Sequence, residues 1–212
     1  TGDADTGTGD TGLVDGPTEA IPEGTDPFAD AIVSFTPGPD AGFGSEALPD
    51  IVLGGPEGSG ASAGSVDVLS LGENGEIILE MTDLGIVDGP GPDLLVFENP
   101  FLGWFEAGAV AVSEDGILWV EWPCEASNVE DDYPGCAGTA TVYLNSLSGI
   151  DPTDPDAAGG DAFDLADLGM ERARYVRIRD TGENTHAYGG TSGGFDLDAI
   201  AAVNWEVLEA EE

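Results

Sequence analysis

The sequence predicts an all-β fold, a β-sandwich of the jelly-roll type, for most of its 212 residues. Short apolar runs recur at intervals of roughly ten to twenty residues, a spacing typical of the strands in sandwiches and jelly rolls. The segments between these runs are rich in turn-forming residues, and the chain contains 33 glycines and 14 prolines. No segment shows helical periodicity of its apolar residues over three turns. With 41% apolar residues, the chain can fill one sizeable core.

Individual strands are placed by the apolar runs and by the turns that bound them. Asn74-Gly75 predicts a hairpin between the runs on either side of it, because Asn-Gly favours the tight turns of hairpins. The turn 114–116 predicts a second hairpin in the same way. The predicted strands are 31–35, 65–71, 76–81, 94–97, 109–113, 117–122, 140–144, 174–179 and 200–208. One short helical turn is expected at 162–168.

The first residues differ in composition from the rest of the chain. Residues 1–12 read TGDADTGTGDTG, which contains no apolar side chain larger than alanine and cannot contribute to a core. We therefore expect a tail or linker over 1–25 and one β-sandwich domain over 26–212. No apolar stretch approaches the ~20 residues needed to cross a bilayer. The polar N-terminal residues do not resemble a signal peptide, so we expect the mature form of an exported chain without a transmembrane segment.

The charge is strongly negative, because 43 acidic residues face four arginines and no lysine, for a net charge of −39. Such a domain repels itself within a Debye length of roughly 8 Å at physiological salt. Metal cations or high salt would offset this repulsion. Nucleic acid and anionic membranes are poor partners, because phosphate binding needs outward-facing Lys and Arg.

Cys124 and Cys136 are the only cysteines, and both lie in a stretch rich in Pro, Asp and Gly. A disulfide between them would close a small loop and stabilise the fold by roughly 2–3 kcal/mol. Such a pair favours an oxidising, extracellular compartment. The alternative is two reduced buried thiols, and two cysteines without His or Cys neighbours do not make a zinc site.

Three stretches resemble segments of discoidin-like jelly rolls and of related carbohydrate-binding modules. They are ARYVRI (173–178), GFDLDAI (194–200) and SEDG with Trp119 (113–119). Together with DGPGPD (88–93) and FEN (97–99), they resemble, over roughly 28–207, a group of uncharacterised bacterial cell-surface and secreted proteins. This resemblance implies a galactose-binding-domain-like jelly roll located outside the cell or on its surface.

Calcium is the expected ligand, because it takes six to eight hard oxygen donors from carboxylates and carbonyls, and this chain is rich in both. The resemblance implies a structural Ca²⁺ where the closing strand meets the first strand, which nominates Asp196 or Asp198 with Asp30. A second candidate site pairs Asp93 with Glu98, on either side of one apolar strand and next to a Gly/Pro loop.

A third candidate metal site is an acidic segment that is too polar to belong to the core. It contains Asp151, Asp154, Asp156, Asp161 and Asp164. None of the three candidate sites has the D-x-D-x-D-G spacing and terminal glutamate of an EF-hand. The alternative for each of them is an acidic loop that is simply solvated.

The four arginines lie within one eight-residue stretch, and strand alternation places Arg177 and Arg179 on one face with Tyr175. The two guanidinium groups could clamp an anionic ligand, since they match a carboxylate in geometry. With 43 acids available, however, we expect the arginines to neutralise neighbouring carboxylates.

Two hydrolase-like motifs lack the partners that catalysis needs. Residues 190–194 read GTSGG, but the only histidine, His186, lies in the same loop, whereas a triad base normally comes from a separate element. Asp180-Thr181-Gly182 has the sequence motif of one half of an aspartic-protease site. The complete site requires two carboxylates in mirrored lobes. We therefore expect no catalytic residues and no enzymatic activity.

Aromatic residues in two loops are candidates for stacking against sugar rings. Trp104 and Phe105 lie in a glycine-flanked loop, and His186 and Tyr188 share the loop before the closing strand. If the two loops meet at one end of the sandwich, they could form a shallow glycan site. The remaining tryptophans are expected in the core, namely Trp119, Trp122 and Trp205.

These observations lead to two functional hypotheses. In the first, the chain is a non-catalytic, calcium-stabilised binding or adhesion module outside the cell, with an extracellular glycan as its ligand. In the second, it is a structural subunit of an extracellular filament or surface layer. The N-terminal tail would then add a strand to the sheet edge of a neighbouring copy, forming a homo-oligomer in which divalent cations bridge acidic faces.

Overall fold

The computed structural model describes residues 20–98, 104–184 and 190–209, and it confirms an all-β sandwich of antiparallel sheets. In these residues, helix is limited to α1 (Pro155–Ala158) and to short 3₁₀ turns such as η4 (Leu165–Leu168). The strands are β1 (Ala31–Thr36), β2 (Leu69–Ser70), β3 (Glu76–Glu80), β4 (Leu84–Val87), β5 (Leu94–Phe97), β6 (Glu106–Ser113), β7 (Val120–Glu121), β8 (Asp161–Phe163), β9 (Arg172–Ala173), β10 (Tyr175–Asn184), β11 (Asp196–Leu197), β12 (Ala199–Ala202) and β13 (Trp205–Val207).

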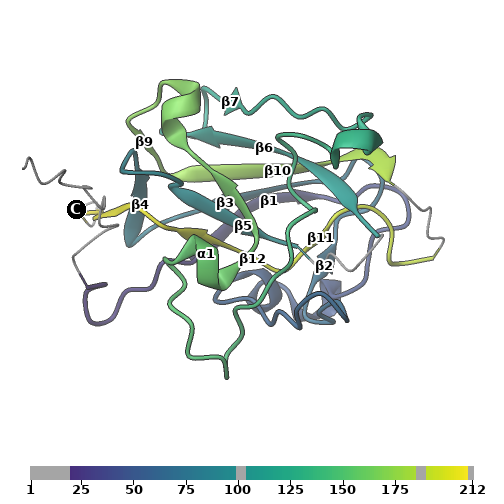
Figure 1. Cartoon of the computed structure of the whole chain (residues 1–212), viewed down its shortest axis with the longest axis horizontal. Helices are drawn as coiled ribbons and strands as arrows, with labels where there is room; N and C mark the ends of the chain where they lie inside the picture. The colour runs from purple at the N-terminus through teal and green to yellow at the C-terminus, as the bar shows by residue number, and fades with distance from the viewer. Residues whose placement is uncertain (1–19, 99–103, 185–189, 210–212) are drawn as a thin grey trace, which may run out of the picture.

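The largest sheet has the strand order β1-β3-β10-β6-β7, and neighbouring strands are antiparallel throughout. Figure 1 shows its long strands β6, β10, β3 and β1 lying side by side. A three-stranded sheet, β12-β5-β8, forms the second layer. A further three-stranded sheet, β13-β4-β9, and a two-stranded sheet, β11-β2, complete the sandwich.

Strand β5 is covered on both of its faces, as expected for an uninterrupted apolar run. Successive side chains of a strand point to opposite faces. Leu94 and Val96 therefore join the main core between the layers. Leu95 and Phe97 join a second apolar cluster on the other side, which includes Val142. The central position of β5 in its sheet means that the residues at its two ends are also held firmly.

Each of the four arginines pairs with a glutamate, and Arg177 and Arg179 do so on the outer face of the five-stranded sheet. Arg177 lies 3.5 Å from Glu121 and 3.8 Å from Glu76, and Arg179 lies 3.6 Å from Glu121. The other two pairs are Arg174 with Glu80 and Arg172 with Glu206. The expected neutralisation of carboxylates by the arginines is confirmed.

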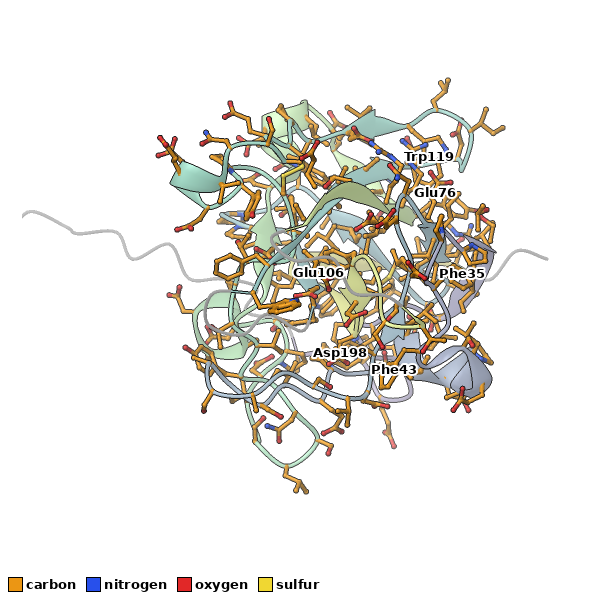
Figure 2. The ribbon with its side chains drawn as sticks, turned by 90° about the vertical axis from the view of Figure 1, so that its right-hand side faces the viewer. Phe35, Phe43, Glu76, Glu106, Trp119 and Asp198 are labelled. Carbon is orange, nitrogen blue, oxygen red and sulfur yellow. A yellow bond between two sulfur atoms is a disulfide. The ribbon has the colours of Figure 1, made fainter. Side chains whose placement is uncertain are left out.

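Trp119 does not lie in the core as expected. Its ring packs under the Arg177 guanidinium, with 4.9 Å from the guanidinium carbon to the ring centroid. Figure 2 shows Trp119 and Glu76 toward the outside of the molecule. A cation–π contact of this kind keeps the indole on the solvent side of the sheet.

The predicted hairpin at Asn74-Gly75 is wrong, although the hairpin formed by β6 and β7 is confirmed. A tight turn does form, because the Gly75 N–H donates to the Gly72 carbonyl and Asn74 adopts a φ of +58°. Strand β2, however, pairs with β11, whereas β3 pairs with β1 and β10. The turn therefore carries the chain from one sheet to another.

Other boundaries also differ from the predicted ones. Of 140–144, only Val142 forms a ladder contact, an isolated bridge with Gly159. The run 200–208 is divided between β12 and β13, which belong to different sheets. The expected helical turn at 162–168 begins as the end of β8 and continues as η4. Residues 1–19 of the expected tail lie outside the described residues.

Candidate metal centre and buried acidic groups

Asp93 immediately precedes β5, and its fully buried carboxylate joins three segments of the chain. One carboxylate oxygen accepts hydrogen bonds from the Gly89 N–H at 2.9 Å and the Asn204 side-chain amide at 2.8 Å. The other oxygen accepts from the Leu165 N–H at 2.8 Å. Burial raises the pKa of Asp93, and these three hydrogen bonds act in the opposite direction.

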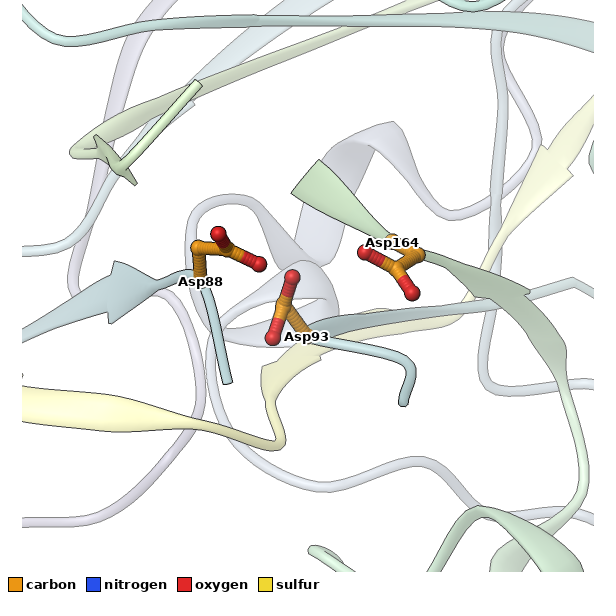
Figure 3. A group of neighbouring side chains, drawn as sticks. All are labelled: Asp88, Asp93 and Asp164. Atoms are coloured by element: carbon orange, nitrogen blue, oxygen red, sulfur yellow. The ribbon is translucent and has the colours of Figure 1, made fainter. Parts of the chain in front are cut away.

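Asp88 and Asp164 bring two further carboxylates to Asp93. Asp88 follows β4 and is exposed, and Asp164 follows β8 and is half-buried. One oxygen from each of the three carboxylates lies within 4.8 Å of the other two. Figure 3 shows the three carboxyl groups gathered around one point. We refer to this group as the Asp cluster.

Strand pairing explains why Asp93 and Asp164 meet. In the antiparallel ladder of β5 and β8, Leu94 lies opposite Phe163. The residue before Leu94 must therefore lie next to the residue after Phe163. Asp164 also caps η4 by accepting a hydrogen bond from the Ala166 N–H at 2.8 Å, which fixes its backbone beside Asp93.

The Asp cluster has the donor chemistry of a site for a hard cation. Calcium binds carboxylate oxygens in irregular geometries and accepts further backbone carbonyls and waters. Within residues 20–98, 104–184 and 190–209, no other group of three metal-ligating side chains brings its ligand atoms so close together. The four arginines pair with glutamates elsewhere, so a cation would offset the mutual repulsion of the three aspartates.

The structure groups the predicted metal-site residues differently from the sequence analysis. Asp93 and Asp164, which the sequence assigned to different sites, lie together in the Asp cluster with Asp88. Glu98 lies beyond the other end of β5, roughly 16 Å from Asp93 at the usual rise per residue of an extended strand. Asp161 also lies apart from the Asp cluster, at the start of β8.

Asp30, Asp196 and Asp198 bind three different parts of the chain. Asp30 accepts hydrogen bonds from the N–H groups of Thr82 and Asp83. Asp196 accepts from the Ser70 hydroxyl. Asp198 accepts from the Glu57 N–H and from the Ser65 hydroxyl. None of the three belongs to the Asp cluster.

Asp198 is buried, and its protonation depends on pH in the neutral range. Burial is the main cause that raises the pKa of Asp198 to about 7. The hydrogen bonds from Glu57 and Ser65 lower this pKa, and the charges of Asp67 and Glu57 raise it.

Two further buried carboxyl groups lie at the end of β5 opposite the Asp cluster. Glu98 follows β5 and Glu106 opens β6, and the exposed fraction of each residue is only 3%. Burial raises the pKa of Glu98 well above its ordinary value, with further contributions from the charges of Asp196, Glu106 and Asp161. Burial and the charges of Asp196 and Asp180 raise the pKa of Glu106 to about 9. Glu106 was not among the residues nominated from the sequence, where it is a single acid before an apolar run.

Asp151 and Asp154, in the same acidic segment, have local structural roles. Asp151 accepts hydrogen bonds from Thr153, and Asp154 caps α1 through the N–H groups of Asp156 and Ala157. This segment therefore does not form one metal site within the described residues.

A disulfide joins Cys124 and Cys136, as expected. Beside it lies a pocket of about 300 Å³, whose walls include Trp122, Tyr133 and Phe163. The hydroxyl of Tyr133 is buried without a hydrogen-bond partner. Asp132, Thr139 and Asp167 add polar groups to the lining. We refer to this space as the disulfide pocket.

The aromatic residues nominated for sugar binding are only partly described. Phe105 packs edge-on against Tyr133, with 6.4 Å between the ring centroids, and so lies behind the disulfide pocket. Trp104 is half-buried next to it. His186 and Tyr188 lie outside the described residues.

Comparison with known proteins gave no match, either to a protein-family model or to a curated protein. None of the helices in the described parts of the chain combines the length and apolar character that crossing a bilayer demands.

Proposed function

We propose that this chain is a non-catalytic, extracellular β-sandwich module that binds Ca²⁺ at the Asp cluster and binds carbohydrate at the disulfide pocket. The convergence of Asp88, Asp93 and Asp164 is the observation that carries the calcium assignment. The disulfide is compatible with an extracellular location.

Calcium at this position would stabilise the sandwich by joining its sheets. Asp88 follows β4, Asp93 precedes β5 and Asp164 follows β8, so one ion would link strands of two different sheets. Ca²⁺ fits this site better than Mg²⁺, because Mg²⁺ demands near-ideal octahedral geometry and keeps several of its waters.

The calcium assignment is tested by isothermal titration calorimetry and thermal unfolding of the full chain. A ligand at about 100 times its Kd stabilises the folded state by ~2.7 kcal/mol, which corresponds to a rise in Tm of about 5–10 °C for a domain of this size. The double variant Asp88→Asn, Asp164→Asn should lose most of this rise. Glu114→Gln, in the exposed turn after β6, removes one carboxylate elsewhere and should respond to Ca²⁺ as the wild type does. An unchanged calcium response in the double variant would refute the assignment.

The carbohydrate assignment is supported by the chemistry of the disulfide pocket. Its volume of about 300 Å³ falls at the lower end of the range for small-molecule sites. Aromatic side chains form part of its lining, and sugar rings pack their C–H surfaces against such groups. The carboxylates of Asp132 and Asp167 can accept hydrogen bonds from sugar hydroxyls.

Binding is tested on a glycan array in the presence of Ca²⁺, followed by titration of any glycan that binds. Asp132→Asn keeps the size of a side chain in the pocket lining and removes its negative charge, so it should preserve the Tm and weaken glycan binding about tenfold. Asp151→Asn, away from the pocket, is the matched control and should bind as the wild type does. The assignment fails if no glycan binds, or if Asp132→Asn and Asp167→Asn both bind with wild-type affinity.

A further inference from the structure

Glu98 and Glu106 both face the interior between the two layers of the sandwich. In β5, the main core takes Leu94 and Val96, and alternation places the next residue of this series, Glu98, on the same face. In β6, the main core takes Val110 and Val112, and the same alternation leads back to Glu106. Two acidic side chains thus occupy core-facing positions at one end of the molecule. Figure 2 shows Glu106 near the middle of the molecule in that view.

Other buried acids near this end are satisfied by backbone N–H groups. Asp161 and Asp180 each accept hydrogen bonds from three backbone N–H groups, as expected for carboxylates with a structural role. The donors are Gly138, Thr139 and Ala140 for Asp161, and Asn74, Gly182 and Phe195 for Asp180.

Glu98 and Glu106 break this pattern. Glu98 accepts a hydrogen bond from the Asp196 N–H, but its Oε2 atom is buried and has no hydrogen-bond partner among the described residues. The same holds for the Oε1 atom of Glu106. Two inward-facing carboxyl groups therefore each present an unsatisfied oxygen in a region where further carboxylates contribute negative potential.

Within residues 20–98, 104–184 and 190–209, none of the four arginines compensates for the charge of these groups. Arg177 and Arg179 are on the neighbouring strand β10, but they pair with glutamates on the outer face of the sheet. The inward positions of the same strand are Val176 and Ile178, followed by Asp180. The interior face of β10 thus adds a further acid to this end of the core.

We propose that Glu98 and Glu106 form a second, buried site for a hard divalent cation, and that Ca²⁺ is its occupant. Each glutamate can supply one or two oxygens, and the unpartnered Oε2 and Oε1 atoms are available to an ion without the loss of an existing hydrogen bond. Calcium is favoured because its coordination number and geometry are flexible.

The second site differs from the Asp cluster in how far it is formed before the ion binds. Glu98 and Glu106 do not belong to a group of three metal-ligating side chains whose ligand atoms lie within 4.8 Å of one another in the described residues. Other ligands, such as backbone carbonyls and waters, would complete the coordination of the ion. Glu98 also lines a hollow of about 10 Å³ with Val142 and the glycine- and serine-rich segment 58–65.

The test counts bound ions by calorimetry in the full chain. The wild type should bind two Ca²⁺ ions, Glu106→Gln one, and Glu114→Gln two. In the Asp88→Asn, Asp164→Asn background, one ion should remain, and the addition of Glu106→Gln should reduce its affinity at least tenfold. The second site does not depend on the Asp cluster, so this background separates a failure of one site from a failure of the other. If the double variant Asp88→Asn, Asp164→Asn does not fold, the number of ions bound by the wild type and by Glu106→Gln still tests the second site.

Thermal unfolding in EDTA separates an ion site from a merely structural role. Glu106→Gln keeps the size of the side chain and leaves an uncharged group that needs no ion, so its Tm in EDTA should be close to that of the wild type, while the rise in Tm on addition of Ca²⁺ becomes smaller. A variant that only damaged packing would have a lower Tm under both conditions. The proposal is overturned if the background binds no Ca²⁺, or if Glu106→Gln binds as many ions as the wild type. If Glu98 and Glu106 share a proton instead of binding an ion, the Asp88→Asn, Asp164→Asn background will bind no Ca²⁺.

Discussion

The side-chain amide of Asn204 donates a hydrogen bond of 2.8 Å to the carboxylate of Asp93, across 111 positions in the sequence. The same amide donates to the Pro92 carbonyl at 3.1 Å. Asn204 thus connects the segment after β12 to the residue that precedes β5 and belongs to the Asp cluster. A buried polar contact of this kind is costly to break on one side only, because the other partner remains desolvated.

Asn204→Ala should therefore destabilise the fold by about 1–3 kcal/mol and also weaken calcium binding, since Asp93 loses a group that orients it. Urea unfolding in EDTA measures the first effect, and titration with Ca²⁺ measures the second. Asn128→Ala is a suitable control, because that amide bonds to carboxylates in an exposed loop. Equal stability of the two variants would contradict the role given to Asn204.

Removal of the disulfide should lower stability without abolishing the sandwich. The bond closes a loop with a sequence separation of 12, for which loop-closure entropy predicts a contribution of roughly 2–3 kcal/mol. The double variant Cys124→Ser, Cys136→Ser should show a correspondingly lower Tm and weaker glycan binding, because Tyr133 and Cys136 line the same pocket. Calcium binding at the Asp cluster should persist, and its loss would indicate that the disulfide supports the whole fold.

The pH dependence of stability should include a contribution from Asp198. In the unfolded chain its carboxyl group has a pKa of about 3.9, whereas burial raises the pKa of Asp198 in the folded chain to about 7. Between these two values the folded state keeps a proton that the unfolded state has released. The free energy of unfolding therefore falls as the pH rises from about 4 to about 7, and this contribution is constant at higher pH.

Asp198→Asn should flatten the dependence of stability on pH in this range, because the amide does not titrate. Urea unfolding at pH 5 and pH 8, in EDTA and at fixed ionic strength, provides the measurement. The expected difference between wild type and variant in the pH effect is on the order of 1–4 kcal/mol, since one pKa unit corresponds to about 1.4 kcal/mol. A variant with the same pH slope as the wild type would show that Asp198 is not responsible.

The edge strand β1 should not support self-association of the sandwich. Its pairing with β3 is interrupted by an irregularity between Ile32 and Ser34, and such bulges disfavour edge-to-edge pairing. Light scattering after size-exclusion chromatography should give the mass of one chain in both Ca²⁺ and EDTA. Calcium-dependent growth to higher mass would instead favour the filament or surface-layer hypothesis.

Much of the β-structure could be predicted because local signals determine it. The run Leu94–Phe97 is bounded by acidic residues and is buried on both faces, so its apolar composition gives the limits of β5 correctly. The hairpin of β6 and β7 is also local. The turn at Asn74-Gly75 shows the limit of this reasoning, because a tight turn does not determine which strands pair on either side of it. That depends on β10 and β11, which lie more than 90 residues further along the chain.

The candidate sites required the same long-range information. Carboxylates at strand ends can be recognised in the sequence, and Asp93 and Glu98 were found in this way, whereas Asp164 was found as one acid of a polar segment. Their grouping depends on the register of β5 with β8, which places Asp93 beside Asp164 and leaves Glu98 at the far end. Glu106 gave no local signal, because a single acid before an apolar run is also typical of an exposed strand end. Only the inward register of β6 identifies it.

The position of β5 also makes it a natural reporter of global opening. It is the middle strand of its sheet and is covered on both faces, so its hydrogen-bonded amides have no path to water through local fraying. Amides of this kind exchange with deuterium only when the whole domain unfolds. Exchange rates at Leu95 and Val96 would thus measure the total free energy of unfolding. Because the strand ends in Asp93 on one side and Glu98 on the other, the same amides would register the binding of an ion at either end.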